Sequence, residues 1–137
     1  MFDCWTEASQ FLIKTTSALF EVQMQCEENY RMQVTDNIKD YIMQNIGGDL
    51  SLVAIANRTN YNPSYISRLF KRLEHINLSE YIVKARLAKA KELLLNGNMN
   101  INEVAAEIGF DSPQYFATVF RKHVGLSPNQ YRLDHLT

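Results

Sequence analysis

A pattern of aromatic, basic and proline residues occurs twice in this chain of 137 residues, about 50 positions apart. The tripeptide Pro-Ser-Tyr at 63–65 matches Pro-Gln-Tyr at 113–115. The offset of 50 also pairs Phe70 with Phe120, Lys71-Arg72 with Arg121-Lys122 and Tyr81 with Tyr131. Upstream of the prolines an offset of 49 pairs Ile55-Ala56 with Val104-Ala105 and Tyr61 with Phe110, which leaves Asp111 as an extra residue. Such a repeat predicts two copies of one supersecondary unit.

The periodicity of both copies is helical. No segment alternates between apolar and polar residues over the length of a strand, and neither glycine nor proline occurs in residues 1–46. Gly47-Gly48 then interrupts the chain, and later glycines and prolines follow at short intervals. We therefore predict an all-α fold with helices near 35–46, 51–59, 63–74, 78–95, 101–108, 113–123 and 128–135.

Several helix starts carry capping signals. Asn62 and Ser112 each stand directly before a proline, the arrangement of a capping side chain followed by proline at the first helical position. Ser127 with a glutamine three residues later predicts a complete capping box. Weaker versions pair Asn77 with Glu80 and Asn100 with Glu103.

Each copy has the parts of a helix-turn-helix unit. A small alanine in its first helix, Ala56 or Ala105, allows two helices to cross closely. Asn60 or Gly109 follows in the turn, where a left-handed backbone is tolerated. We place the first unit at 51–74, the second at 101–123, and a connecting helix at 78–95.

The second helix of each unit has two faces. Its apolar face is predicted to be buried: Ile66, Leu69, Phe70 and Leu73 in the first unit, and Phe116, Val119, Phe120 and Val124 in the second. The other face is small, polar or basic and suits the major groove of DNA. The predicted base-reading residues on it are Ser64, Ser67, Arg68, Gln114, Ala117 and Thr118.

The distribution of charge also favours a polyanionic partner for the second part of the chain. Residues 1–50 hold eight acidic and three basic side chains, whereas residues 51–137 hold seven acidic and eleven basic ones. Lys71, Arg72, Arg121 and Lys122 are predicted to contact phosphates. The N–H groups of the helix starts at Ser64 and Gln114 should also favour phosphate.

The connecting helix of 18 residues would be a rod of about 27 Å, which can hold two recognition helices about one DNA turn apart. Its basic residues Lys84, Arg86, Lys89 and Lys91 are candidates for DNA-backbone contact or for solvation. Its predicted buried positions are Tyr81, Ile82, Ala85, Leu87, Ala88, Leu94 and Leu95.

Residues 35–136 resemble the DNA-binding domain of the AraC/XylS family of bacterial regulators. The most specific part is the second unit with its tail: Ile101, Val104-Ala105, Gly109-Phe110, Tyr115-Phe116, Phe120-Arg121-Lys122, Gly125, Ser127-Pro128 and Tyr131-Arg132. The first unit and the connecting helix match through Ala56, Tyr61, Ser64-Tyr65, the run Ser67 to Lys71, Tyr81, Arg86, Ala90 and Leu93-Leu94.

The resemblance implies a monomer that grips two successive major grooves of double-stranded DNA and activates transcription by touching RNA polymerase. Asn60 and His75 depart from it, because the family usually has glycine at these positions. Thr118 stands where many members carry a basic residue, so we expect the first unit to carry more of the base specificity.

Residues 1–34 lie outside the resemblance and are predicted to form one helix or two. Trp5, Leu12, Leu19 and Cys26 recur every seven residues, but Thr15 and Asn29 interrupt the intermediate positions. One hypothesis is a signalling or self-associating linker from a longer regulator, such as a two-component response regulator. The alternative is a helix that packs Phe11, Phe20 and Val22 onto the DNA-binding domain.

Other classes of function find little support in the sequence. The three histidines are dispersed, and neither a Gly-rich phosphate loop nor a zinc-ligand spacing occurs, so no enzyme, cofactor or metal site is predicted. Cys4 and Cys26 are too few for the zinc centre of an alkyl-transfer repair protein. The absence of a long apolar run or secretory signal predicts a cytoplasmic protein. The remaining alternative is a helical protein-interaction module, whose binding would lack the salt dependence of phosphate contacts.

Overall fold

The computed structural model describes residues 3–136, with side chains from Thr16 to Leu136, and this part of the chain is all-α with seven helices. They are α1 (Asp3–Gln44), α2 (Leu52–Thr59), α3 (Pro63–Glu74), α4 (Leu78–Leu95), α5 (Ile101–Glu107), α6 (Pro113–Val124) and α7 (Pro128–Leu136). The bounds of α2 to α7 lie within one residue of the predicted ranges. The predicted fold class is confirmed.

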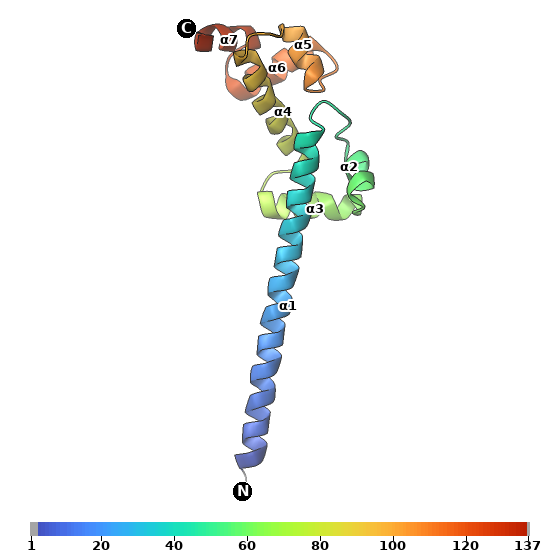
Figure 1. Cartoon of the computed structure of the whole chain (residues 1–137), viewed down its shortest axis with the longest axis vertical. Coiled ribbons are helices and arrows are strands. Elements are labelled where there is room, and N and C mark those ends of the chain that lie inside the picture. The colour runs from blue at the N-terminus through green and yellow to red at the C-terminus, as the bar shows by residue number, and fades with distance from the viewer. Residues whose placement is uncertain (1–2, 137) are drawn as a thin grey trace.

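Helix α1 is much longer than the predicted helix at 35–46. It continues without a break through residue 34, so the expected division between extension and DNA-binding domain lies inside one helix. Figure 1 shows its C-terminal part among the other helices and its N-terminal part projecting away from them. Residues 16–30 are all exposed, and Val34 is the first buried residue of the described side chains.

The exposed part of α1 overturns one alternative from the sequence. Phe20 is 61% exposed and Val22 is 60% exposed, so neither packs onto the rest of the molecule. The side chain of Phe11 lies outside the described residues, as do those of Cys4, Trp5, Leu12 and Thr15. Roughly 37 Å of helix, residues 3–27, therefore extends beyond the part of α1 that lines hollows with α3.

One hydrophobic core runs through both repeats. Val34, Ile38 and Ile42 are fully buried and follow one another at four-residue spacing, the period of a single helix face. They join the same cluster as Phe70 of the first unit and Phe120 of the second. The C-terminal part of α1, from Val34 onward, therefore belongs to the same core as the two units.

The predicted helix caps and left-handed turns are present. Ser112 Oγ accepts from the backbone N–H of Tyr115 at 3.0 Å. Asn60 (φ 61°), His75 (φ 64°) and Gly109 (φ 86°) are all left-handed. The reciprocal capping box lies at Asn100–Glu103, where only a weaker version was predicted. Asn62 and Asn77 accept from N–H groups in the first turns of the helices that they precede. At Ser127 only half of the predicted capping box is present, because Ser127 Oγ accepts from the Gln130 N–H at 3.1 Å but the Gln130 side chain does not bond back to the Ser127 backbone.

Two positions of the connecting helix α4 that were predicted to be buried are exposed in the structure. Ala88 and Leu95 are exposed, whereas Ala90 is fully buried and Leu93 packs against the core. Consecutive buried positions 87, 90 and 94 follow the helical period, so the true face is rotated slightly from the expected one. None of the helices in the described part combines the length and apolarity that a membrane span requires.

Two arginines brace the loops that precede the two units. Arg86 of α4 donates from its guanidinium to the carbonyls of Ile46 and Gly48, both at 3.1 Å. Arg132 of α7 donates in the same manner to the carbonyls of Leu94, at 2.9 Å, and Met99. Each arginine therefore ties a helix that follows a unit to the chain segment that enters it.

This result corrects the expectation for Arg86, which was for DNA-backbone contact or solvation. Its burial lowers the pKa of the guanidinium, an effect that the carboxylates of Asp111 and Asp49 oppose. The two carbonyls are 40 and 38 residues away in sequence, so helical periodicity could not identify them.

The second unit also touches, through glycines, the loop that enters the first unit. A Cβ on Gly47 would collide with the carbonyl oxygen of Glu107, at the end of α5. A Cβ on Gly109 would lie 3.1 Å from a guanidinium nitrogen of Arg86 and 3.2 Å from the carbonyl oxygen of Ile46. The relative position of the units therefore depends on this close backbone contact as well as on α4.

Candidate nucleic-acid interface

Helix α3 of the first unit presents a polar and basic surface. Ile66, Leu69 and Phe70 are buried beneath it. All five predicted DNA-contacting residues of the helix are exposed, namely Ser64, Ser67, Arg68, Lys71 and Arg72. The separation follows from the 3.6-residue period, which places the two sets on opposite sides of one helix.

The start of α3 differs from the expectation of free N–H groups. The N–H of Ser64 donates to Asn62 Oδ1 at 2.9 Å, and that of Tyr65 donates to the same atom at 3.2 Å. Arg68 folds back along the helix, with its Nε donating to the Ser64 carbonyl at 3.3 Å. The Ser64 N–H is therefore already engaged, and the charged group of α3 nearest to its start is Arg68.

Helix α6 of the second unit is built in the same way but carries less charge at its start. Gln114, Thr118, Arg121 and Lys122 are exposed, and Ala117 is half-buried. The Thr118 hydroxyl donates to the Gln114 carbonyl at 2.9 Å. That bond occupies the hydroxyl hydrogen and leaves the methyl group for apolar contact.

Two of the remaining basic residues of α4 are paired with carboxylates of their own helix. Lys84 Nζ lies 3.9 Å from Glu80 and Lys89 Nζ lies 3.4 Å from Glu92, both as exposed pairs along the helix. Such pairs are solvated and weak. In the part of the chain that the structure describes, the ion pairs within 4.0 Å include none of the basic side chains of α3 and α6.

Sequence reasoning missed Arg31, which lies beside α3. It lines a hollow together with Tyr65, Arg68, Leu69 and Arg72. Its spacing of four from Thr35 and eight from Lys39 places it on one face of α1 with them, but nothing in that spacing indicates that α3 packs beside this face. The described residues contain no group of three His, Cys, Asp or Glu side chains placed to hold a metal ion.

Tandem helix-turn-helix units with solvent-facing second helices define a DNA-binding domain. A family model described as a helix-turn-helix domain matches residues 55–134. The crystal structure of an AraC-type DNA-binding regulator from Chromobacterium violaceum is 25% identical, covers 74% of this chain and 91% of its own, and has a TM-score of 0.70. The chain belongs to the AraC family of helix-turn-helix transcription regulators.

Two relatives are more similar in sequence. The transcriptional activator AarP of Providencia stuartii is 32% identical over 105 residues, which cover 77% of this chain and 78% of AarP. The C-terminal domain of AraT, a response regulator from Geobacillus stearothermophilus, is 37% identical with a TM-score of 0.71, and the match covers 74% of this chain and 84% of that domain.

Other curated relatives are much longer than this match. The chain spans 14% of YtdP and 20% of YesN, both from Bacillus subtilis, and 35% of YijO from Escherichia coli.

Proposed function

We propose that residues 35–136 are the DNA-reading end of a longer transcription activator, which grips two successive major grooves with α3 and α6. The observation that carries this proposal is the pair of exposed polar helix surfaces, joined by a braced connecting helix. The name of AarP, a transcriptional activator, supports activation, and that of AraT, a response regulator, supports a two-component context. RNA polymerase is the partner that activation requires.

Within this proposal the exposed residues divide by chemistry. Arg68 has the forked guanidinium that recognises guanine, and the Gln114 amide can pair with an adenine edge. Ala117 and the Thr118 methyl suit contact with thymine methyl groups. Ser64 and Ser67 have side chains short enough to let the helix enter the groove. The phosphate contacts are assigned to Lys71, Arg72, Arg121 and Lys122.

Selection of bound sites from a random duplex pool tests the two-groove reading. Two conserved half-sites about one helical turn apart are expected. Arg68→Ala should lower affinity for the selected site by about 1–3 kcal/mol and relax preference at one base pair. The matched change Lys71→Ala should weaken selected and random duplexes alike, and equal losses for Arg68→Ala on both would contradict its base-reading role.

Salt dependence separates DNA reading from a protein-interaction module. With about six phosphate contacts, the logarithm of the binding constant should fall against the logarithm of salt concentration with a slope of roughly −5. A slope near zero would favour the interaction module. Activation is tested by run-off transcription with purified RNA polymerase from a promoter beside the selected site, where a decrease in transcript would identify a repressor.

Self-association through the extension is the remaining part of the proposal. Leu19, Val22 and Cys26 are exposed and form one stripe along α1 at heptad spacing. The charged residues of this stretch lie off the stripe, at Glu21, Glu27, Glu28 and Arg31. A projecting helix with an apolar stripe gains stability when a second copy covers it.

Substitutions on two sides of the exposed helix test this association by sedimentation. Leu19→Lys with Val22→Lys should convert an associating protein to a monomer without unfolding it, because both positions are solvated. Phe20→Lys with Met24→Lys is the matched control, since these exposed residues lie roughly 140° around the helix from the stripe. If the unmodified protein is monomeric at high micromolar concentration, or if both double variants dissociate equally, association through the stripe is ruled out.

A further inference from the structure

We propose that Arg31 of α1, together with Arg72 of α3, binds a backbone phosphate of the DNA beside the groove that α3 enters. The linker helix would then be part of the DNA-contacting surface. This inference rests on the proposed function, in which α3 lies in the major groove, and adds a contact from a helix outside the repeat.

The first observation is a hollow between α1 and α3 that is rich in arginine. Three of its five lining residues are Arg31, Arg68 and Arg72, and the others are Tyr65 and Leu69. No carboxylate lines it. Like charges repel when they converge on one space, and an anion placed there reverses the sign of the interaction. Arginine suits phosphate in particular, because its planar fork donates two hydrogen bonds to neighbouring oxygens.

The positive charge in this hollow has little internal compensation. Arg31 lies 3.9 Å from Glu27, a pair at the outer limit of an ion pair and exposed on both sides. Such pairs are screened and contribute little. Among the residues that the structure describes, the ion pairs within 4.0 Å include neither Arg68 nor Arg72.

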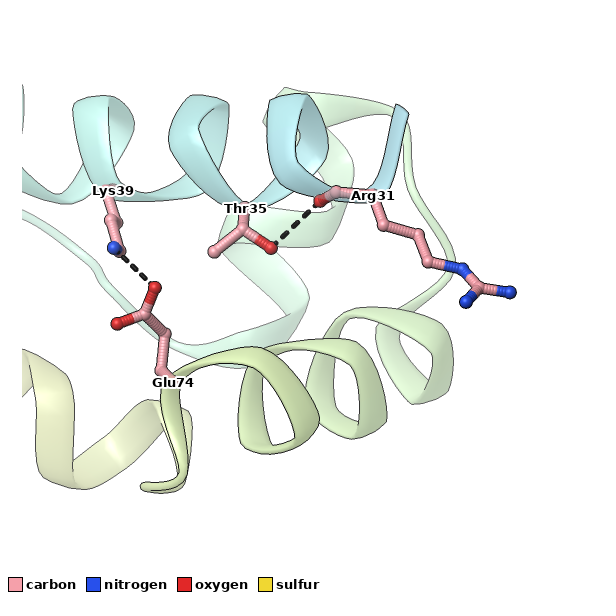
Figure 2. A network of polar contacts seen from close by, with 4 residues as sticks. All are labelled: Arg31, Thr35, Lys39 and Glu74. Atoms are coloured by element: carbon pink, nitrogen blue, oxygen red, sulfur yellow. Dashed lines mark hydrogen bonds and ion pairs between the residues drawn. The ribbon is translucent and has the colours of Figure 1, made fainter. Parts of the chain in front are cut away.

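The position of Arg31 is set by the residues that follow it on the same face of α1. Thr35 is buried, and its hydroxyl donates to the Arg31 carbonyl at 3.0 Å. One turn further, Lys39 forms an ion pair with Glu74, and the hydrogen bond between them raises the pKa of Lys39. Figure 2 shows Lys39 and Glu74 joined at one end of this row and the Arg31 side chain extending away at the other.

The location of the hollow fits the path of a DNA strand. A helix in the major groove has a phosphate backbone on each flank. One flank of α3 bears a hollow lined by Leu52, Ser64, Ser67 and Arg68, toward α2, and the other bears the arginine-rich hollow toward α1. Arg68 lines both hollows and therefore lies on the side of α3 between them, where it can reach bases. Arg31 and Arg72 remain for the phosphates on the α1 side.

Arg31→Gln in the full chain tests this contact, with binding to selected and random duplexes measured by fluorescence anisotropy over a range of salt. The affinity should fall by about 3- to 10-fold for both duplexes, and the salt slope should become shallower by about 0.9, as for one lost phosphate contact. Arg31→Lys should keep the slope because it keeps the charge. Thr35 bonds to the backbone of Arg31, so circular dichroism and thermal unfolding should be unchanged.

Met24→Glu is the control for net charge. It makes the same change of one charge unit at an exposed position about two turns away, and should leave the slope near that of the parent. An equal loss for Met24→Glu and Arg31→Gln would overturn the specific contact. An unchanged salt slope for Arg31→Gln, together with weaker binding by Lys71→Ala, would also overturn the Arg31 contact. DNA reading by α3 would not be contradicted by that result. A parent that binds no duplex would refute the proposed function itself.

Discussion

The two helix-turn-helix units share one pattern but are supported differently. Tyr65 and Tyr115 occupy corresponding positions of the repeat, yet Tyr65 packs against the core in the hollow beneath α1. Tyr115 is 60% exposed. The first unit is thus completed by a helix that also extends far beyond the domain.

The second unit is held together by its own aromatic residues. Phe116 and Phe120 lie 5.7 Å apart between ring centroids, and Tyr131 of α7 lies 5.5 Å from Phe120. In the first unit the corresponding Phe70 meets Tyr81 at 5.0 Å. One copy of the repeat is therefore stabilised by its own aromatic residues and the other by a neighbouring helix. The unit next to α1 also has the more basic start of its recognition helix.

The largest expected effects come from these aromatic cores. Phe70→Ala and Phe120→Ala each remove a fully buried ring and should lower the free energy of unfolding by about 3–5 kcal/mol. Phe120→Ala should cost about 1 kcal/mol more, because it loses two aromatic contacts where Phe70→Ala loses one. Urea unfolding of the two variants measures the difference. A larger loss of stability for Phe70→Ala than for Phe120→Ala would contradict the proposal that the second unit depends more on its aromatic contacts.

The contact between the units should be sensitive to a single methyl group. Gly47→Ala forces the backbone away from the Glu107 carbonyl and should lower stability by about 1–3 kcal/mol. It should also reduce preference for the natural spacing of half-sites, measured on duplexes with one base pair inserted or removed. Gly48→Ala is the control, because its added Cβ would lie 3.4 Å from the Asn45 carbonyl oxygen, an ordinary contact. Equal effects of the two changes would show that the interunit contact is unimportant.

The two units also differ at the C-terminal ends of their recognition helices, where smaller effects on stability are expected. The C-caps of α3 and α6 are both left-handed, but one is His75 and the other is Gly125. His75→Gly should raise stability by up to about 1 kcal/mol, because glycine adopts this conformation without the steric strain of a side chain. Gly125→Ala should lower it by a similar amount, although space is open around it. Thermal unfolding that moves in the same direction for both would contradict this account.

The smallest effect is expected at the start of α6. Thr118→Ala should lower affinity for the selected site by less than about 0.8 kcal/mol, because it removes one γ-methyl group from a contact with thymine and the lost hydroxyl was bonded to the Gln114 carbonyl. Competition binding beside Arg68→Ala provides the measurement. A loss for Thr118→Ala equal to that for Arg68→Ala would remove the proposed inequality between the units.

Much of the fold was available from local rules. The repeat gave two units, proline after a capping side chain gave the starts of α3 and α6, and tolerance of left-handed backbone identified Asn60 and Gly109. The faces of the recognition helices followed from their period, so the exposure of Arg68 and Thr118 was predictable. Their roles on DNA stay predictions.

The unpredicted features join residues that are distant in sequence. The length of α1 followed from the absence of breakers in residues 1–46, but which of its faces would be buried did not, because an amphipathic pattern names no partner. In the same way, Arg86 resembled any other basic residue on a helix until the fold brought the Ile46 and Gly48 carbonyls to it.

The order and ends of six helices, and the faces of the two recognition helices, thus followed from the sequence itself, since capping and periodicity act over a few residues. Tertiary structure alone decided that Gly47 meets Glu107, that two arginines brace the entry loops, and that Arg31 comes beside Arg72. These contacts bridge 33 to 60 positions. The free energy that selects them comes from packing the whole core, which no short window of sequence contains.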